Sequence, residues 1–259
     1  MRASFLNRMK RAFDPQTPEL MDRPQPVTPE LEAAMRDLAS INGYFGSHRL
    51  VRQFLALWLN PGRCYRVLDL CTASGDIPRA MVDWARARDI ALRIDAVDAN
   101  EASLEIARGA SRDYPEIHYL RGDALKFETK ETYDLVLCTL ALHHFGEDEA
   151  AVLLRRCRDL SHRFVLVSDL ERSLLTLAGI YLLTTFLYRA PMARSDGITS
   201  AHRAFSYRDF RALAVAAGWQ NFGHARFLLC RQALWLDLHE LGDIPVVDST
   251  VADGLPCPT

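Results

Sequence analysis

The feature that most constrains the fold is an alternation of short apolar runs with helical stretches. The strand-like runs are 66–70, 92–97, 117–120, 133–138 and 164–167, and the helical stretches between them are 77–87, 101–111 and 148–160. Strands separated by helices of this size form βαβ units, in which helices cover both faces of a parallel sheet. A helix over 206–217 and two strand-like runs within 219–236 follow. We therefore expect an α/β fold with a doubly wound, mostly parallel sheet and an antiparallel C-terminal strand.

Additional segments flank this predicted sheet. Residues 1–27 contain four prolines and are expected to form an extended arm after a short basic helix. Thr28 caps a helix with Pro29 at its first position, which we expect to run to about Ser40. A second amphipathic helix is expected over 47–59.

Composition narrows the class of protein without naming a chemistry. The 259 residues are 49% apolar and 25% charged with a net charge of −2, which excludes fibrous and broadly disordered chains and argues against a nucleic-acid partner. The six cysteines form no C-x-x-C pair, so a zinc knuckle or thioredoxin-like site is not indicated. With no export signal at the start, a cytoplasmic location is expected.

One apolar segment needs a separate interpretation. Residues 173–188 include no charge over 16 positions, whereas a membrane-spanning helix needs about 20. Three threonines and a glycine weaken the segment further. We expect no integral membrane segment here, and a buried or half-buried helix or a lid over an apolar pocket remain open.

A turn of small residues, Asp69-Leu70-Cys71-Thr72-Ala73-Ser74-Gly75-Asp76, follows the first strand. Such a turn lies at the carboxyl end of the strands, where ligands reach backbone N–H groups. Only Gly75 is present of the G-x-G-x-x-G that a dinucleotide site needs. Asp98 ends the second strand, where a carboxylate accepts ribose hydroxyls. These residues favour a nucleoside ligand without a diphosphate.

The runs VLDLCTASGD, VDAN, GDA and YDLVLCTLALHHF resemble the class I S-adenosylmethionine-dependent methyltransferases over roughly residues 45–236. The resemblance is to the small-molecule branch, which includes quinone-biosynthesis-like and secondary-metabolite enzymes. It implies a Rossmann-like fold, S-adenosyl-L-methionine as cofactor and S-adenosyl-L-homocysteine as product. The family loop is usually D-x-G-x-G-x-G, and here Cys71 and Ala73 replace its first two glycines.

The resemblance also implies which residues contact each part of the cofactor and how the chain divides into segments. It implies that Asp69 and the loop backbone hold the methionine end, that Asp98 binds the ribose and that Asp123 reaches the adenine. The implied cofactor-binding residues are Asp69, Cys71, Thr72, Ala73, Ser74, Gly75, Asp98, Ala99, Asp123, Ala124, Cys138, Thr139 and Leu140. The expected parts are an N-terminal arm and helical cap over 1–60, the methyltransferase domain over 61–240 with a helical lid insertion at about 172–205, and a tail over 241–259. Each acid also has a purely structural alternative. Asp69 would cap the turn, Asp98 would cap the following helix, and Asp123 would be a solvated acid in a loop.

Candidate catalytic residues follow the fourth and fifth strands. Methyl transfer from a sulfonium is an in-line displacement that depends on positioning and exclusion of water, and a phenol or enol acceptor also benefits from a base. His143, His144 and Asp169 are the candidates, with Glu171 weaker; a histidine has its ordinary pKa near the working pH. The alternative is that the histidines only form a turn before the next helix.

No metal is expected at this edge. Catechol-type relatives hold magnesium with clustered carboxylates and an amide, whereas Asp169 has no Asp-Asn pair beside it. Two adjacent histidines on a turn are not expected to present two ligands to one ion.

The insertion after the fifth strand is the expected specificity element. An apolar helix over the edge of the sheet where the cofactor is expected suits an apolar or aromatic acceptor. The candidate substrate residues are Tyr44, Tyr181, Asp196, His202 and Arg203. The alternatives are a salt bridge between Asp196 and Arg203, and plain packing for Tyr44.

The sequence thus predicts a methyltransferase that acts on O or C of a small, apolar or aromatic acceptor in the biosynthesis of a specialised metabolite or quinone-like compound. The alternative, motivated by Cys71 and Ala73, is a cofactor-binding protein without transfer activity, acting as a regulator or partner subunit. An NAD-type oxidoreductase is disfavoured by the missing glycines. The expected partner is a small-molecule acceptor and not a nucleic acid, and a homodimer is left open.

Overall fold

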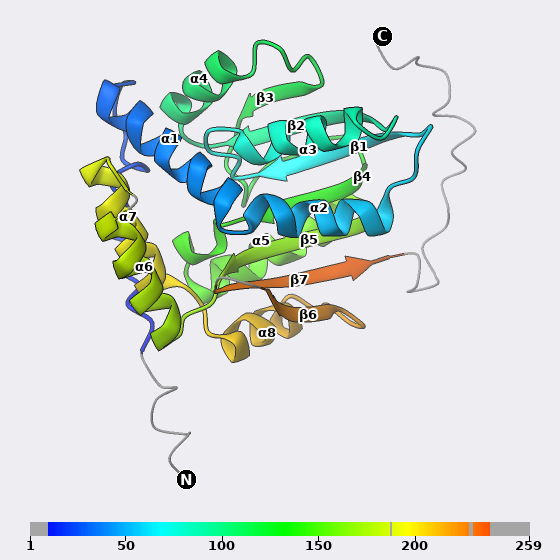
Figure 1. The fold of residues 1–259 in the computed structure, drawn as a ribbon. Coiled ribbons are helices and arrows are strands. Elements are labelled where there is room, and N and C mark those ends of the chain that lie inside the picture. The colour runs from blue at the N-terminus through cyan, green and yellow to red at the C-terminus, as the bar shows by residue number, and fades with distance from the viewer. Residues whose placement is uncertain (1–9, 187, 228–229, 239–259) are drawn as a thin grey trace.

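The computed structural model describes residues 10–186, 188–227 and 230–238, and it contains one seven-stranded sheet (Figure 1). The strands are β1 (Cys64–Leu70), β2 (Ala91–Asp98), β3 (Ile117–Arg121), β4 (Tyr133–Thr139), β5 (Ser161–Leu170), β6 (Gly223–Phe227) and β7 (Arg231–Asp237). The helices are α1 (Pro29–Tyr44), α2 (Ser47–Trp58), α3 (Asp76–Arg86), α4 (Glu101–Ala110), α5 (Glu147–Leu160), α6 (Leu174–Phe186), α7 (Pro191–Arg203) and α8 (Tyr207–Ala216), with a 3₁₀ turn η1 (Leu142–His144).

The sheet has the strand order β3-β2-β1-β4-β5-β7-β6. Strands β1 to β5 pair in parallel, whereas β7 runs antiparallel to β5 and β6 runs antiparallel to β7. The order reverses direction between β1 and β4, which is the switch point where ligands bind in doubly wound sheets. The predicted α/β, Rossmann-like fold with an antiparallel C-terminal edge is confirmed.

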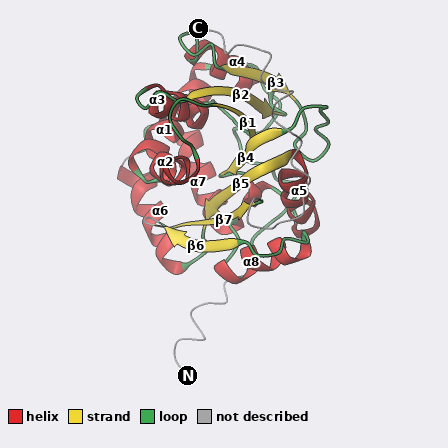
Figure 2. Ribbon diagram, turned by 90° about the vertical axis from the view of Figure 1, so that its right-hand side faces the viewer, coloured by secondary structure: helices red, strands yellow, loops and turns green. Residues whose placement is uncertain are grey.

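Helices cover both faces of the sheet, as Figure 2 shows. Helices α2 and α3 pack against one face through a core that includes Leu55, Val67 and Leu135. Helices α5 and α8 pack against the other through a core that includes Leu68, Val136 and Phe210. Because successive residues of a strand point to opposite faces, Val67 and Leu68 enter different cores.

Helices α1, α6 and α7 lie together at the carboxyl end of the parallel strands (Figure 1). The Thr28 hydroxyl accepts the backbone N–H of Leu31 and caps α1, as predicted. The helix continues through Gly43 to Tyr44, four residues beyond the expected end at Ser40, and Gly46 adopts a φ of 98° between α1 and α2.

The insertion after β5 forms two helices, of which the sequence predicted only α6. Residues 189–203 contain Gly197 and five other small polar or turn-forming residues, which form no helical pattern, yet α7 begins at Pro191. No helix among the described residues is long and apolar enough to cross a membrane. Residues 10–13 are not helical; the rest of the predicted basic helix and the predicted tail over 241–259 lie outside the described residues.

Candidate functional site

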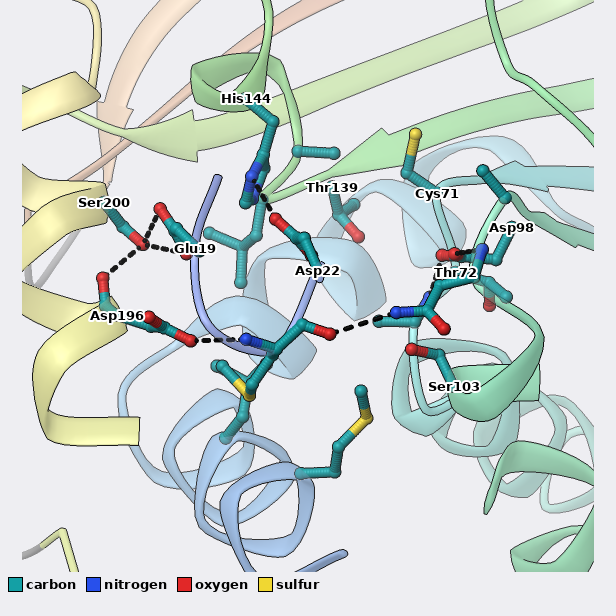
Figure 3. Close-up of a pocket in the computed structure, with 18 of the residues that line it drawn as sticks. Glu19, Asp22, Cys71, Thr72, Asp98, Ser103, Thr139, His144, Asp196 and Ser200 are labelled. Carbon is teal, nitrogen blue, oxygen red and sulfur yellow. Dashed lines mark hydrogen bonds and ion pairs between the residues drawn. The ribbon is translucent and has the colours of Figure 1, made fainter. Parts of the chain in front are cut away.

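A cavity of about 640 Å³ lies at the carboxyl end of the strands. Its walls come from the turn after β1, the ends of β2, β4 and β5, helices α1, α6 and α7, and the arm over residues 19–25. Figure 3 shows residues from these elements converging on one space. The cavity is therefore built from segments that are distant in the sequence and meet at the sheet edge.

The turn after β1 keeps a glycine-like backbone even where its residues are not glycine. Cys71 and Ala73 have φ values of 61° and 49°, in the left-handed region that glycine adopts without strain, and Gly75 has a φ of 69°. A Cβ at Gly75 would lie 2.0 Å from the hydroxyl oxygen of Tyr119, so no other residue fits there. The replacement of two glycines therefore leaves the left-handed conformations of the turn in place.

Polar side chains beneath this turn are buried without partners. The two carboxylate oxygens of Asp69 and the hydroxyls of Thr72 and Ser74 have no hydrogen-bond partner among the described residues. Burial raises the pKa of Asp69 to about 7. Orphaned groups of this kind are costly unless something pairs with them, so the turn fits a ligand that brings its own polar atoms.

Asp98 lies at the cavity wall at the end of β2, where the sequence placed it. Its carboxylate accepts the backbone N–H of Ala73 at 2.8 Å and that of Asn100 at 2.9 Å. It therefore links the turn after β1 to the start of α4. Burial raises the pKa of Asp98, and these two N–H groups partly offset that effect.

The other predicted cofactor residues divide into two groups. Those that line the cavity are Cys71, Thr72, Ala73, Ala99, Asp123, Ala124, Thr139 and Leu140. Those that lie behind its wall are Asp69, Ser74, Gly75 and Cys138. Cys138 points into the core, 1% exposed, so the structure does not bring its side chain to the cavity.

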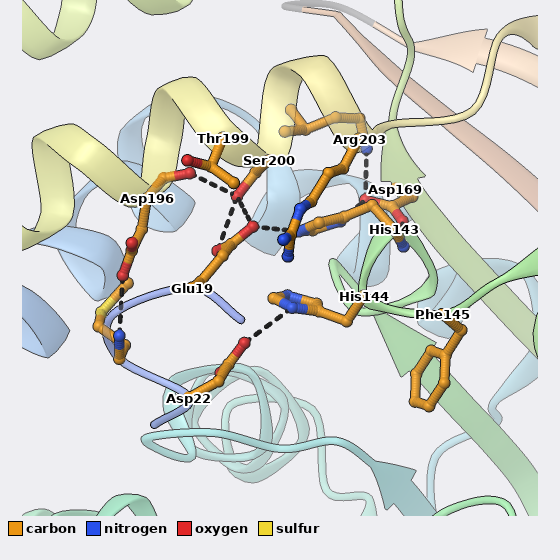
Figure 4. Close-up of polar contacts among 12 residues, drawn as sticks. Glu19, Asp22, His143, His144, Phe145, Asp169, Asp196, Thr199, Ser200 and Arg203 are labelled. Carbon is orange, nitrogen blue, oxygen red and sulfur yellow. Dashed lines mark hydrogen bonds and ion pairs between the residues drawn. The ribbon is translucent and has the colours of Figure 1, made fainter. Parts of the chain in front are cut away.

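His143 and Asp169 form a fully buried polar pair. The ring Nδ1 of His143 lies 2.7 Å from a carboxylate oxygen of Asp169, and the His143 backbone N–H donates to the other oxygen at 2.9 Å. Burial opposes ionisation of Asp169, but His143 and the backbone N–H of Leu170 keep its pKa below the usual value. The second ring nitrogen, Nε2, is buried without a hydrogen-bond partner in the described residues and lines the cavity side (Figure 4).

His144 pairs with a residue of the arm that the sequence did not single out. Its Nδ1 lies 2.8 Å from a carboxylate oxygen of Asp22. Burial lowers the pKa of His144, but Asp22 and the more distant Glu19 and Asp169 outweigh this effect and raise it to about 10. His144 is therefore held as a cation in contact with the arm.

Glu19 is a second arm residue at this end of the cavity. It is 5% exposed, accepts the hydroxyl of Ser200 and lies 3.8 Å from Nε2 of His143. One ligand-type atom each of Glu19, His143 and His144 lies within 4.8 Å of the others. The argument that adjacent histidines do not converge was wrong, since η1 places their ring centroids 4.2 Å apart; the prediction that no metal binds stays a prediction.

The predicted substrate residues are mostly placed elsewhere. Tyr44 is 84% exposed at the end of α1 and does not line the cavity, and neither do His202, Arg203 and the half-exposed Tyr181. Tyr44 is exposed because α1 extends beyond its expected end and turns this position outward. The cavity contact of α6 comes instead from Ile180.

Asp196 and Arg203 hold the arm rather than each other. Asp196 lines the cavity and accepts the backbone N–H groups of Leu20 and Met21 at 2.8 and 2.9 Å. The guanidinium of Arg203 donates to the backbone carbonyls of Asp14 and Thr17. The expected salt bridge between Asp196 and Arg203 is absent from the ion pairs of the described residues.

Among the charged residues that line the cavity and were missed, two are buried, Asp76 and Arg231. Asp76, at the start of α3, accepts Asn42 Nδ2 at 3.1 Å and lies 2.9 Å from His48 Nε2. Arg231 begins β7 and is 6% exposed. No local pattern marks either residue, although a charge at the first position of an apolar strand was a usable signal for Arg231.

Comparisons with known proteins agree on one family. Residues 67–162 match the family described as "Methyltransferase domain". A 2-phytyl-1,4-naphtoquinone methyltransferase of Thermosynechococcus vestitus (strain NIES-2133 / IAM M-273 / BP-1) is 38% identical over 81 residues, which are 31% of this chain. The match spans only about a third (35%) of that relative's length.

Solved structures share the fold. The magnesium protoporphyrin IX methyltransferase of Synechocystis PCC 6803 with bound S-adenosylhomocysteine superposes with a TM-score of 0.52 at 16% identity, over 83% of this chain and 90% of that one. The plantazolicin methyltransferase BamL gives 0.58 at 12% identity, over 76% and 71%. S-adenosylmethionine is the cofactor of this family, and the orphaned polar groups under the turn and the carboxylate of Asp98 fit such a nucleoside. Residues 67–162 therefore resemble a methyltransferase domain, and the fold is one that solved methyltransferases share.

Proposed function

We propose that the protein transfers a methyl group from S-adenosylmethionine to a hydroxyl oxygen of a small, largely apolar or aromatic acceptor. The observation that carries this proposal is the buried pair of His143 and Asp169, which leaves Nε2 of His143 beside the cavity without a hydrogen-bond partner among the described residues and with Glu19 3.8 Å away. This nitrogen and the turn after β1 belong to the same cavity. A base at one end and a nucleoside site at the other are what methylation of a hydroxyl group requires.

The residues of the turn and Asp98 would hold the cofactor. Asp98 would accept hydrogen bonds from the ribose hydroxyls, and the hydroxyl of Thr72 would lie toward its methionine end, with Asp69 and Ser74 behind the turn. Asp123 and Ala124 would lie at the adenine. When bound, the cofactor supplies a methyl group on a sulfonium, which reacts with a nucleophile in line with the leaving sulfur.

His143 would then remove the acceptor proton. With Nδ1–H donating to the Asp169 carboxylate, the neutral ring of His143 would present a lone pair at Nε2. A hydroxyl group that donates to this nitrogen becomes a better nucleophile as its proton leaves. Asp169 does not take the proton and instead fixes the ring orientation, as in other histidine–carboxylate pairs. The arm and helices α1, α6 and α7 would exclude water.

The apolar part of the cavity supports an apolar acceptor. Ile180 and Leu170 line it beside Tyr188, from three different segments. The curated relative acts on a phytyl-substituted naphthoquinone by its name, which is an aromatic acceptor with an apolar chain. We take an apolar, aromatic acceptor for this chain, and His143 alone argues for a hydroxyl oxygen as the methylated atom, because a 1,4-naphthoquinone has carbonyl oxygens and no hydroxyl group.

Calorimetry and mass spectrometry together test this proposal. We expect S-adenosylmethionine to bind, and we expect its methyl group to appear in at least one member of a panel of phenolic and isoprenoid acceptors. Binding without transfer to any acceptor would favour the alternative of a regulatory or partner subunit. No binding at millimolar cofactor would reject both.

A further inference from the structure

A buried arginine lines the cavity without a hydrogen bond or ion pair to any residue that the structure describes. Arg231 is the first residue of β7 and lines the cavity, and it is 6% exposed. Its Nε is buried without a hydrogen-bond partner, and among the described residues no hydrogen bond or ion pair involves its guanidinium. A buried charge without a partner is strongly unfavourable unless a counter-charge joins it.

The nearest strand does not supply that counter-charge. Arg231 pairs with Leu170 of β5, and the preceding residue is Asp169. The carboxylate of Asp169 is already occupied, since it accepts the ring and backbone N–H groups of His143 and the backbone N–H of Leu170. Burial lowers the pKa of Arg231 and Asp169 offsets part of this effect, but a guanidinium stays protonated in proteins.

The surroundings of Arg231 lie on the acceptor side of the cavity. Its strand partner Leu170 lines the cavity, and the buried ring of Tyr188 is close enough to influence its charge. Ile180 and Ala193 add apolar walls from α6 and α7. The cofactor residues, by contrast, follow β1 and β2 on the other side of β4 in the sheet order.

We propose that Arg231 binds a carboxylate of the methyl acceptor, so that the acceptor is an amphipathic hydroxylated acid. The inference rests on the proposed function, because it takes the base to be His143. His143 and Arg231 line the same cavity, and Arg231 pairs across the sheet with Leu170, the residue after Asp169, so a single small molecule can present a hydroxyl group to His143 and a carboxylate to Arg231. Arginine suits this role because its planar fork matches a carboxylate with two parallel hydrogen bonds.

A monoanion fits better than a phosphate dianion. The only other arginine among the described cavity-lining residues is Arg121, which is exposed at the rim at the end of β3. The arm adds the acids Glu19 and Asp22, which repel a second negative charge. The apolar or aromatic acceptor expected from the sequence would therefore also carry one acid group.

The test compares matched acceptors in the full chain saturated with S-adenosylhomocysteine. The probes are a hydroxynaphthoic acid and a hydroxybenzoic acid, each beside the carboxamide of the same ring, with dissociation constants measured by calorimetry. We expect each acid to bind at least about tenfold more tightly than its amide, the effect of a charge-assisted hydrogen-bond pair. Arg231→Gln should remove that preference, and Arg231→Lys should keep part of it.

The matched control is Arg226→Gln on the neighbouring strand β6, where the side chain is exposed and pairs with Glu171. It should leave the preference unchanged. Equal binding of acid and amide by the unaltered protein, or no binding of any probe at millimolar concentration, would overturn the inference. So would a loss of S-adenosylhomocysteine affinity in Arg231→Gln, which would assign the arginine to the cofactor carboxylate.

These outcomes separate the inference from the proposed function. If the acids bind preferentially but no acceptor is methylated, the assignment of Arg231 stands and the proposed function fails. If hydroxyl acceptors without a carboxylate are methylated as efficiently as the acids, the assignment fails and the proposed function stands.

Discussion

Nδ1 of His143 lies 2.7 Å from a carboxylate oxygen of Asp169, and both side chains are almost completely shielded from solvent. The strands β4 and β5 bring them together, because η1 follows β4 and Asp169 is the penultimate residue of the neighbouring strand β5. The pair fixes which nitrogen of the ring faces the cavity. His143 is therefore a candidate base and not only a residue of the turn before α5.

His143→Gln tests this role. Glutamine keeps polarity and approximate size but cannot accept a proton, so we expect kcat to fall by about 10²–10⁴-fold with little change in S-adenosylmethionine affinity. The control is His118→Gln on β3, an exposed histidine outside the cavity. Steady-state kinetics with any acceptor that is turned over checks the prediction, and full activity in His143→Gln would mean that positioning alone drives transfer.

Asp98→Ala tests the nucleoside site. Loss of its carboxylate removes the expected contacts to the ribose as well as the acceptor for the Ala73 backbone N–H. We expect cofactor binding to weaken by about 1–3 kcal/mol, or roughly 5–150-fold. Asp113→Ala, an exposed acid between α4 and β3, is the control. Calorimetry that finds equal affinities in all three proteins would remove the ribose assignment.

The pKa of about 7 at Asp69 predicts a pH dependence of stability. Because this pKa is raised above the unfolded value of 3.8, the folded state binds the proton more tightly. The contribution of Asp69 is therefore most favourable below pH 3.8, and it is lost progressively as the pH rises toward 7.

Asp69→Asn removes this titration. The free energy of unfolding of the variant relative to the unaltered protein should increase between pH 5 and pH 8 in the absence of cofactor, measured by denaturant unfolding at each pH. Bound cofactor, whose ammonium group favours the ionised carboxylate, should reduce the difference. A difference that is constant over this range contradicts the assignment.

Backbone conformation predicts opposite effects at two positions of the turn. Gly75→Ala places a Cβ against Tyr119 at a positive φ, so we expect a large loss of stability and of cofactor binding. Ala73→Gly relieves a left-handed alanine, so we expect equal or higher stability, by up to about 1 kcal/mol. Thermal unfolding distinguishes the two, and an equally stable Gly75→Ala would show that the turn is built differently.

The sheet and the cofactor side of the site were predictable from local patterns. Asp98 ends β2 and His143 follows β4, and parallel strands bring their carboxyl ends to one edge whatever the detailed packing. The pairing of His143 with Asp169 follows from the same rule. The positive φ of Cys71 and Ala73 could not be predicted from residue type, because cysteine and alanine rarely adopt the left-handed conformation.

The acceptor side was much less predictable. The contact of Asp196 with Leu20 joins residues 176 positions apart, and no periodicity encodes it. The segment with four prolines was expected to be an extended arm, yet its residue Glu19 is buried and lines the cavity. Arg203 was read as a substrate contact because a charge near an apolar helix has few obvious partners, and its actual partners are the backbone carbonyls of the arm. Long-range packing decided each of these cases.

A crystal structure of the full chain with S-adenosylhomocysteine tests the central claim most directly. The account predicts that the ligand occupies this cavity, with its ribose hydroxyls on Asp98, its methionine end at the turn over residues 71–75 and its sulfur on the side of His143. A ligand bound outside the cavity, or one whose ribose does not contact Asp98, would contradict the account.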